Sequence, residues 1–219
     1  VSRAWSSDVC SSGLPAEALC LTAGRIEGGP QPMSIGQLLK APGAGFGGEI
    51  IGVGDFVPER PEAPTNFGMR AGYWEGSVGA AHVAVDPSTG EVEVLRYVTV
   101  SDVGRIINPL TAHGQEEGGA LMAFGHALFE ESAFEDGAFQ NPTLLDYRVP
   151  RVTDIAGEFV GRYLERGDGP GPYGAKGMGE TSIITVAPAI ANAIAAATGI
   201  QPRTLPIRPW HLRGAVAPD

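Results

Sequence analysis

Residues 171–180, with the sequence GPYGAKGMGE, combine four glycines with one lysine and one glutamate. They lead into a nearly uncharged stretch, residues 186–197. Glycine allows a positive φ angle and lets another group come close to the backbone. Loops of this kind present backbone N–H groups to an anion at the start of a helix. At such an edge, Lys176 can donate hydrogen bonds and Glu180 can accept a proton.

Neither common nucleotide-binding pattern fits this segment. The mononucleotide pattern G-x-x-x-x-G-K-[ST] requires a glycine directly before the lysine, whereas Ala175 precedes Lys176 and Gly177 follows it. The dinucleotide fingerprint requires a strand, a loop and a helix, with an acidic residue at a set distance, and this arrangement is missing. Taken alone, the segment is equally compatible with a functional loop and with a mobile glycine linker.

A second candidate is Gln115, which lies between glycines in the sequence GQEEGG of residues 114–119. We interpret its amide as a group held at a helix N-terminus, where it can contact a polar ligand. Its neighbours Glu116 and Glu117 are explained more simply as acidic residues at the positive end of a helix dipole.

The histidines at positions 82, 113, 126 and 211 do not have the spacing of metal ligands. His113 and Glu116 share a helix face, but no third ligand lies near them in the sequence. His82 is interpreted as a surface or packing residue. We therefore expect no metal ligand from this chain.

Strands and helices of mixed order are expected to position these residues. Alternating polar and apolar residues on both sides of the turn at 86–90 predict an antiparallel hairpin over residues 78–103. Apolar residues at helical spacing predict helices over residues 113–131 and 186–197, with Gly199 ending the second. Shorter elements are predicted as a strand at 159–164, hairpins at 19–26 and 134–139, and a helix after Ser34. Without a regular βαβ order, this pattern predicts an α+β fold.

The composition is that of a globular chain with unusually few charges. The chain has 219 residues, of which 43% are hydrophobic and 18% are charged, and its net charge is -10. An acidic chain of this kind does not form a nucleic-acid surface, and no uncharged run is long enough to span a membrane. Two cysteines make no disulfide framework and fit a reducing compartment, so we expect a cytoplasmic protein.

The sequence predicts three regions. Residues 1–15 are Ser-rich, lack periodicity and are interpreted as a non-native or unmatched segment. Residues 16–76 are predicted to be a loop-rich partial domain, and residues 77–219 the C-terminal domain. The chain lacks an initiator Met and is expected to be a piece of a longer protein.

Several motifs, in this order and spacing, resemble one known family. They are Asp102-x-Gly104-Arg105-x-x-Asn108-Pro109, Gly114-Gln115-x-Glu117-Gly118-Gly119, Gly125-His126-Ala127-Leu128-x-Glu130-Glu131, Asn141-Pro142-Thr143-Leu144-x-Asp146-Tyr147-Arg148-x-Pro150, Gly174-Ala175-Lys176-Gly177-x-Gly179-Glu180 and Pro188-Ala189-Ile190-Ala191-Asn192-Ala193. The set resembles the C-terminal part of the molybdenum-binding large subunit of the xanthine dehydrogenase, aldehyde oxidase and carbon monoxide dehydrogenase family. The resemblance is most specific from residue 78 onward.

The resemblance implies a molybdopterin-binding domain of a molybdenum hydroxylase. In that family the pterin holds the molybdenum, in bacteria often as the cytosine dinucleotide, and no protein side chain need ligate the metal. The resemblance makes Glu180 the general base beside the metal. A carboxylate in a water-poor pocket suits this task, because loss of solvation favours its protonated form. The residues implied to bind the cofactor are Gln115, Lys176, Gly177, Met178, Gly179, Thr181 and Ser182.

The resemblance also implies partners and a reaction. Electrons leaving the molybdenum pass to an iron–sulfur subunit and an FAD subunit. The N-terminal half of the same subunit completes the site, so the fragment by itself is expected to be inactive. The substrate is a small aldehyde, an N-heterocycle or a related molecule, or carbon monoxide, and water supplies the oxygen. The alternative hypothesis is a degenerate, non-catalytic homologue that docks redox subunits.

Overall fold

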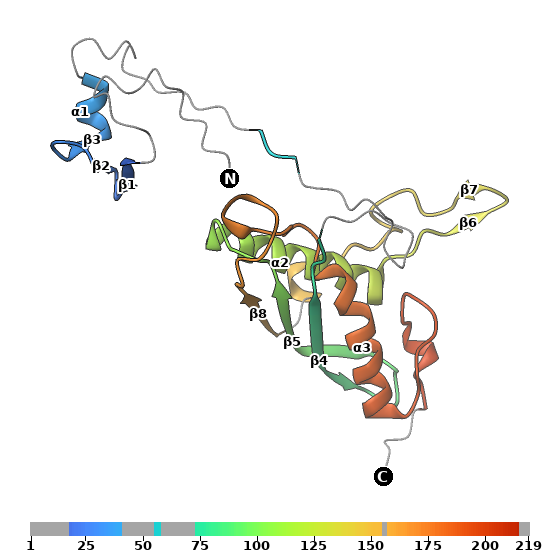
Figure 1. The fold of residues 1–219 in the computed structure, drawn as a ribbon. Coiled ribbons are helices and arrows are strands. Elements are labelled where there is room, and N and C mark those ends of the chain that lie inside the picture. Colours follow the sequence, from blue (N-terminus) through green and yellow to red (C-terminus); the bar gives the residue numbers. More distant parts are fainter. Residues whose placement is uncertain (1–17, 41–54, 58–72, 155–156, 215–219) are drawn as a thin grey trace, which may run out of the picture. The chain divides into compact units, whose positions relative to one another are not determined.

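The computed structural model describes residues 18–40, 55–57, 73–154 and 157–214 (Figure 1). The chain divides into two compact units, residues 1–57 and 58–219. The predicted segment at residues 1–15 lies outside the described residues.

In the first unit, three short strands form an antiparallel sheet in the order β1-β2-β3. They are β1 (Cys20–Thr22), β2 (Arg25–Glu27) and β3 (Met33–Ser34), and α1 (Ile35–Lys40) follows directly. The Ser34 hydroxyl accepts a hydrogen bond from the Gln37 N–H at 3.1 Å, and the Gln37 side chain accepts one from the Ser34 N–H at 2.8 Å. This reciprocal pair is a capping box. The predicted hairpin and helix start are confirmed.

In the second unit, a three-stranded sheet has the order β4-β5-β8. Strands β4 (Ser77–Val85) and β5 (Val92–Asp102) pair antiparallel, and β8 (Glu158–Leu164) pairs parallel to β5. In the turn between β4 and β5, the Asp86 carboxylate accepts hydrogen bonds from Ser88 and Thr89. The bonds from Ser88 are the main reason that the pKa of Asp86 is lowered. The predicted hairpin and the predicted strand at 159–164 are confirmed.

The two faces of this sheet differ. Cross-strand register places three sets of residues on the face that packs against the helices: Ser77, Ser101 and Tyr163; Gly79, Thr99 and Gly161; Ala81, Tyr97 and Phe159. A β-bulge between His82 and Val83 leaves Leu95 unpaired in the register. Because a bulge adds one residue to one strand, Val94 and Tyr97 are both buried despite being three residues apart.

Helix α2 (Pro109–Phe124) begins four residues earlier than the predicted start at 113. The reason is its cap: the Asn108 side chain accepts hydrogen bonds from the N–H groups of Leu110 at 3.0 Å and Thr111 at 3.4 Å. Pro109 takes the first helical position, where its missing N–H costs no hydrogen bond. A π-helical turn, η3 (Gly125–Phe129), continues α2 and ends two residues before the predicted boundary.

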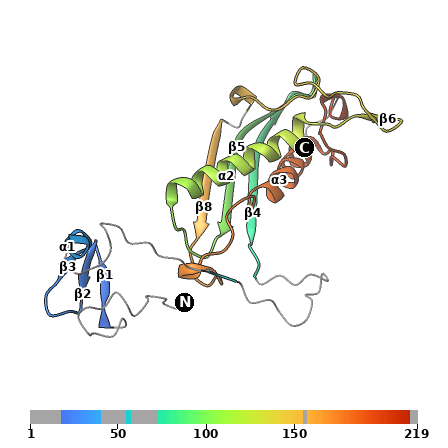
Figure 2. The same ribbon diagram turned by 90° about the horizontal axis from the view of Figure 1, so that it is seen from above.

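Helix α3 (Ile183–Thr198) packs on the same face of the sheet as α2, and Figure 2 shows both helices along the strands. It ends at Gly199, which has φ +74°, as predicted. Pro188 lies inside the helix rather than in its first turn, because α3 begins three residues earlier than expected. The core of this unit lies between helices and sheet. Its members include Tyr97, Phe124, Ile190, Ile194 and Leu212, and the Tyr97 ring lies edge-on to Phe124 at 5.5 Å.

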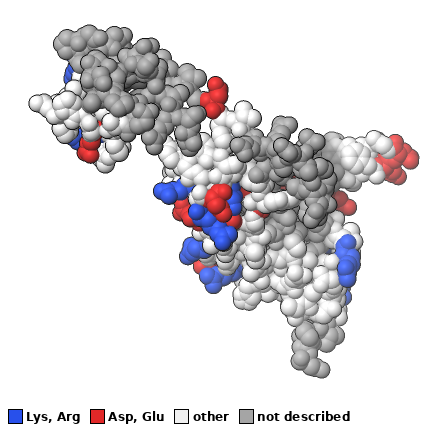
Figure 3. All heavy atoms as spheres, in the orientation of Figure 1, with Lys and Arg blue, Asp and Glu red and all other residues white. Residues whose placement is uncertain are grey.

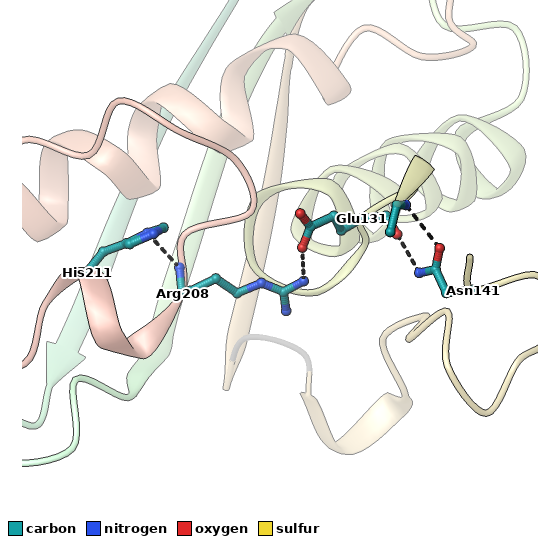
Figure 4. Close-up of polar contacts among 5 residues, drawn as sticks. Glu131, Asn141, Arg208 and His211 are labelled. Atoms are coloured by element: carbon teal, nitrogen blue, oxygen red, sulfur yellow. Dashed lines mark hydrogen bonds and ion pairs between the residues drawn. The ribbon is translucent and has the colours of Figure 1, made fainter. Parts of the chain in front are cut away.

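Shorter elements complete the second unit. They are the hairpin of β6 (Phe134–Glu135) and β7 (Ala138–Phe139), which was predicted, and the 3-10 turns η4 (Val152–Asp154), η5 (Pro172–Gly174) and η6 (Pro209–His211). Glu131 lies just after η3 and contacts two segments that are distant from each other in the sequence (Figure 4). Its carboxylate pairs with Arg208 at 2.7 Å, and its carbonyl accepts from the Asn141 amide at 2.7 Å.

Runs of two or three strands are thus separated by helices without a repeated βαβ unit, and the predicted α+β fold is confirmed. Among the residues that the structure describes, no helix has both the length and the apolar character needed to cross a membrane.

Candidate cofactor site

The loop at residues 171–180, which we call the Gly-rich loop, packs against the end of strand β5. The Lys176 N–H donates to the Val103 carbonyl at 3.0 Å, and within the loop the Gly171 N–H donates to the Ala175 carbonyl at 2.9 Å. Gly104 has φ +68°, and a Cβ there would meet the carbonyl oxygen of Gly174. These backbone contacts argue against a mobile glycine linker.

Lys176 is the centre of an ion-pair network. Its ammonium lies 2.9 Å from Asp102 Oδ2 and 3.1 Å from Asp168 Oδ1, and its side chain is 9% exposed. The hydrogen bond from Lys176 is the main cause that lowers the pKa of Asp102. The same bond is the main cause that raises the pKa of Lys176. The predicted phosphate-binding lysine is therefore already paired with two carboxylates.

Gln115, Lys176 and Met178 line one cavity of about 210 Å³. The exposed Gln115 belongs to the second turn of α2, and the other two belong to the Gly-rich loop. The structure thus brings together three of the residues predicted from separate motifs.

Glu180 is exposed and does not line this cavity. Its backbone lies near the middle of α2, where a Cβ on Gly119 would be 3.9 Å from the Glu180 Cα. Its carbonyl accepts a hydrogen bond from the Ile183 N–H at 3.1 Å, in the turn that starts α3. The carboxylate is therefore held on an ordered backbone and is open to other molecules.

Thr181 and Ser182 are buried, and their hydroxyls are used within the chain. Thr181 Oγ1 donates to Glu75 Oε2 at 2.7 Å, and Ser182 Oγ donates to the Glu116 carbonyl at 2.9 Å. A Cβ on Gly177 would meet the Glu75 carboxylate, whereas a Cβ on Gly179 would meet nothing within 4 Å. These two hydroxyls anchor the chain just after Glu180, whereas Lys176 lies before Glu180 in the loop.

Sequence reasoning missed the role of Glu116, which was interpreted as an ordinary acidic residue. Its side chain is 2% exposed, and Oε1 accepts hydrogen bonds from Thr99 at 3.0 Å and Ser101 at 2.8 Å. Burial, followed by the charges of Glu116 and Glu117, raises the pKa of Tyr163 to about 12. The signal available in the sequence was the polar pair Thr99 and Ser101, which alternate onto the same strand face as Tyr97.

Three further cavity-lining residues were also missed as site residues: Arg105, Asn108 and Thr111. Arg105 is exposed and makes no ion pair or hydrogen bond with the part of the chain that the structure describes, so its guanidinium is available to an anion. Its position inside the first quoted motif was the only signal for it.

The donors around the cavity suit an anionic organic cofactor. A guanidinium and an amide can both donate hydrogen bonds to phosphate or pterin oxygens. Within the described ranges, no three His, Cys, Asp or Glu side chains come together as they would around a metal ion.

Comparison with known proteins identifies the family. The molybdopterin cofactor-binding domain matches residues 12–156, more than half of the chain, and the chain belongs to this family. Relatives include the aldehyde oxidoreductase molybdenum-binding subunit PaoC of Escherichia coli K12, 41% identical over 67% of this chain and 21% of its own length. The putative xanthine dehydrogenase molybdenum-binding subunit XdhA of the same organism is 39% identical over 61% of this chain and 19% of its own length.

Comparison with solved structures points to the same family. The aldehyde oxidoreductase from Desulfovibrio gigas matches with a TM-score of 0.58 and 31% identity, over 64% of this chain and 15% of that one. Quinoline 2-oxidoreductase from Pseudomonas putida 86 matches with a TM-score of 0.53 and 34% identity, over 59% and 17%. The predicted membership of the molybdenum hydroxylases and the fold of their molybdopterin-binding domain are confirmed. The chain spans about a fifth of the length of the curated relatives.

Proposed function

We propose that this chain forms one wall of the molybdopterin site in an oxidoreductase. The enzyme would hydroxylate a small aldehyde, an N-heterocycle or a related substrate, or oxidise carbon monoxide, with oxygen from water. The observation that carries the proposal is the cavity where Gln115 of α2 meets Lys176 and Met178 of the Gly-rich loop.

The bound cofactor would supply the redox chemistry, and the chain would supply binding groups and a base. We assign cofactor contacts to the Gln115 amide and to the backbone of residues 177–179, with Arg105 as a further cation at the cavity. Since the Lys176 ammonium is already paired with Asp102 and Asp168, its predicted direct contact with phosphate is the weaker assignment.

Glu180 is the proposed general base, and its carboxylate would accept the proton of the attacking water-derived oxygen. The support is its position: it is exposed, and it lies on the loop next to the middle of α2. The water-poor surroundings that this role needs would come from segments of the longer subunit that face this loop.

Glu180→Gln in the complete enzyme tests the base. We expect turnover to fall by about 10²- to 10⁴-fold, because the amide cannot accept the proton, with molybdenum content unchanged. Glu117→Gln is the matched control, since Glu117 is an exposed glutamate on α2 that pairs only with His113 among described residues, and it should keep near-normal turnover. Near-normal turnover in Glu180→Gln would show the assignment to be wrong.

The cofactor form and the partners are part of the same proposal. We infer a cytosine dinucleotide form of the pterin, iron–sulfur and FAD partner subunits, and a cytoplasmic location. The alternative is a non-catalytic docking module, and the exposed apolar residues Leu144 and Leu145, at 84% and 95% exposure, favour extensive contacts with other chains. Molybdenum and pterin in the complete purified protein would support the enzyme and exclude the docking module.

A further inference from the structure

We propose that Asp102 and Lys176 form a positioning pair that fixes the Gly-rich loop to the end of strand β5. In this inference, which rests on the proposed function, the pair acts on catalysis through the loop. Lys176 is then a positioning residue for the loop that carries Met178 and Glu180, and it does not hold the cofactor phosphate itself.

Asp102 is a rigid anchor for the lysine. It is the last residue of the central strand β5, and its N–H donates to the Gly76 carbonyl at 2.8 Å. Its two carboxylate oxygens have separate tasks: Oδ2 lies 2.9 Å from Lys176 Nζ, and Oδ1 accepts from the Gly104 N–H at 3.2 Å. The carboxylate therefore joins the loop to the tight turn that leaves the strand.

The surroundings of Lys176 favour a structural role over anion binding. Two carboxylates lie within 3.1 Å of one ammonium, so a phosphate placed there would be repelled by Asp102 and Asp168. Figure 3 shows basic and acidic side chains mixed together over the region where the loop after β8 lies in Figure 1. Arg105, which lines the same cavity and lacks a partner among described residues, is the better cation for a phosphate.

The loop has anchors on both sides of Glu180. Thr181 and Ser182 hold the side toward α3, through Glu75 and the Glu116 carbonyl. Lys176 holds the side toward the cavity, through Asp102 and through its own N–H to the Val103 carbonyl. Loss of the ion pair should therefore loosen the loop up to Glu180 while the start of α3 stays in place.

The test is a double-mutant cycle of Asp102→Asn and Lys176→Gln in the assembled holoenzyme. We expect each variant to lower kcat about 10- to 100-fold, because misplaced groups lose catalytic orientation. KM and molybdenum content should stay within about twofold, and the double variant should be no worse than either single one. Lys176→Arg keeps the ion pair and should restore most of kcat, while Asp168→Asn, which alters a half-exposed partner, should have the weaker effect.

Hydrogen exchange of the bonded N–H groups of Gly171, Gly174 and Lys176, measured in the assembled holoenzyme, reports on the loop without any turnover. We expect faster exchange in Asp102→Asn and Lys176→Gln, and normal protection in Lys176→Arg. Loss of molybdenum in Lys176→Gln but not in Asp102→Asn, with additive effects, would make Lys176 a cofactor ligand and overturn the proposal. Unchanged exchange in both variants would also overturn it. Because exchange does not depend on the base, normal turnover in Glu180→Gln would refute the base assignment of the proposed function and leave this test intact.

Discussion

Glu116 connects helix α2 to strand β5 through a buried carboxylate. A charge without partners in a protein interior is strongly unfavourable. Here Thr99 and Ser101 donate to it, and its backbone carbonyl accepts from Ser182 at the start of α3. One residue thus links both helices and the central strand.

Tyr163 lies beside this carboxylate and has a buried hydroxyl with no hydrogen-bond partner among the described residues. We expect Tyr163→Phe to stabilise the fold by about 0.5–1 kcal/mol, since it removes an unsatisfied polar group. The gain should grow between pH 10 and 12. The folded pKa is raised to about 12, so in this range the unfolded tyrosine ionises first and the wild type loses stability as the pH rises.

Urea unfolding at pH 7 and at pH 11 measures both effects. Tyr147→Phe is the matched control, because the Tyr147 hydroxyl donates to Glu130 at 2.8 Å, and its loss should destabilise the fold. Equal destabilisation by the two substitutions would contradict the account of Tyr163.

At the scale of elements, the site depends on how the Gly-rich loop meets the end of β5. The contact is a close approach of backbone to backbone, since Gly104 lies against the Gly174 carbonyl and the Gly167 N–H donates to the Gly104 carbonyl at 2.7 Å. Any side chain at Gly104 would push the loop away from the strand and open the cavity wall.

Gly104→Ala should therefore destabilise the protein by more than backbone strain alone. We expect a loss of about 2–4 kcal/mol, from the left-handed φ of +68° together with displacement of the loop. Gly199→Ala is the matched control: it has φ +74° with nothing near its Cβ, and should lose only about 1 kcal/mol. Equal losses in thermal or urea unfolding would show that the close approach is unimportant.

At the scale of the whole molecule, the chain supplies only part of a site. Both helices cover one face of the β4-β5-β8 sheet, and Val78 and Leu164, whose register positions place them on the other face, are 71% and 52% exposed. Figure 3 shows broad areas without charged side chains on the face that it views. These surfaces support the proposal that other segments or subunits cover much of this chain.

If so, cofactor binding should need the longer protein. We expect the complete purified protein to contain molybdenum and pterin in equal molar amounts, and the 219-residue chain alone to retain neither and to show no turnover. Metal analysis and pterin fluorescence measure both. Stable retention of the cofactor by the isolated chain would contradict the proposal that this chain forms only one wall of the molybdopterin site.

Local patterns in the sequence predicted much of the fold. The alternation around the turn at 86–90 predicted β4 and β5, and Gly199 predicted the end of α3, because turn and cap preferences act over a few residues. The ordered motifs around Gln115 and Lys176 were sufficient to predict the family, since several independent spacings agree.

Only the tertiary structure determined the partners of those residues. From the sequence, Lys176 was interpreted as a donor to a bound cofactor. Its pairing with Asp102, 74 positions earlier, depends on the parallel pairing of β8 with β5 and on the path of the loop. Likewise, Glu116 is buried only because α2 lies across Thr99 and Ser101. Contacts between distant residues depend on how the elements pack, and local propensity does not encode that packing. The loop at residues 171–180, which by its own sequence was equally compatible with a functional loop and a mobile linker, is in the folded chain bonded to the end of β5 through Lys176.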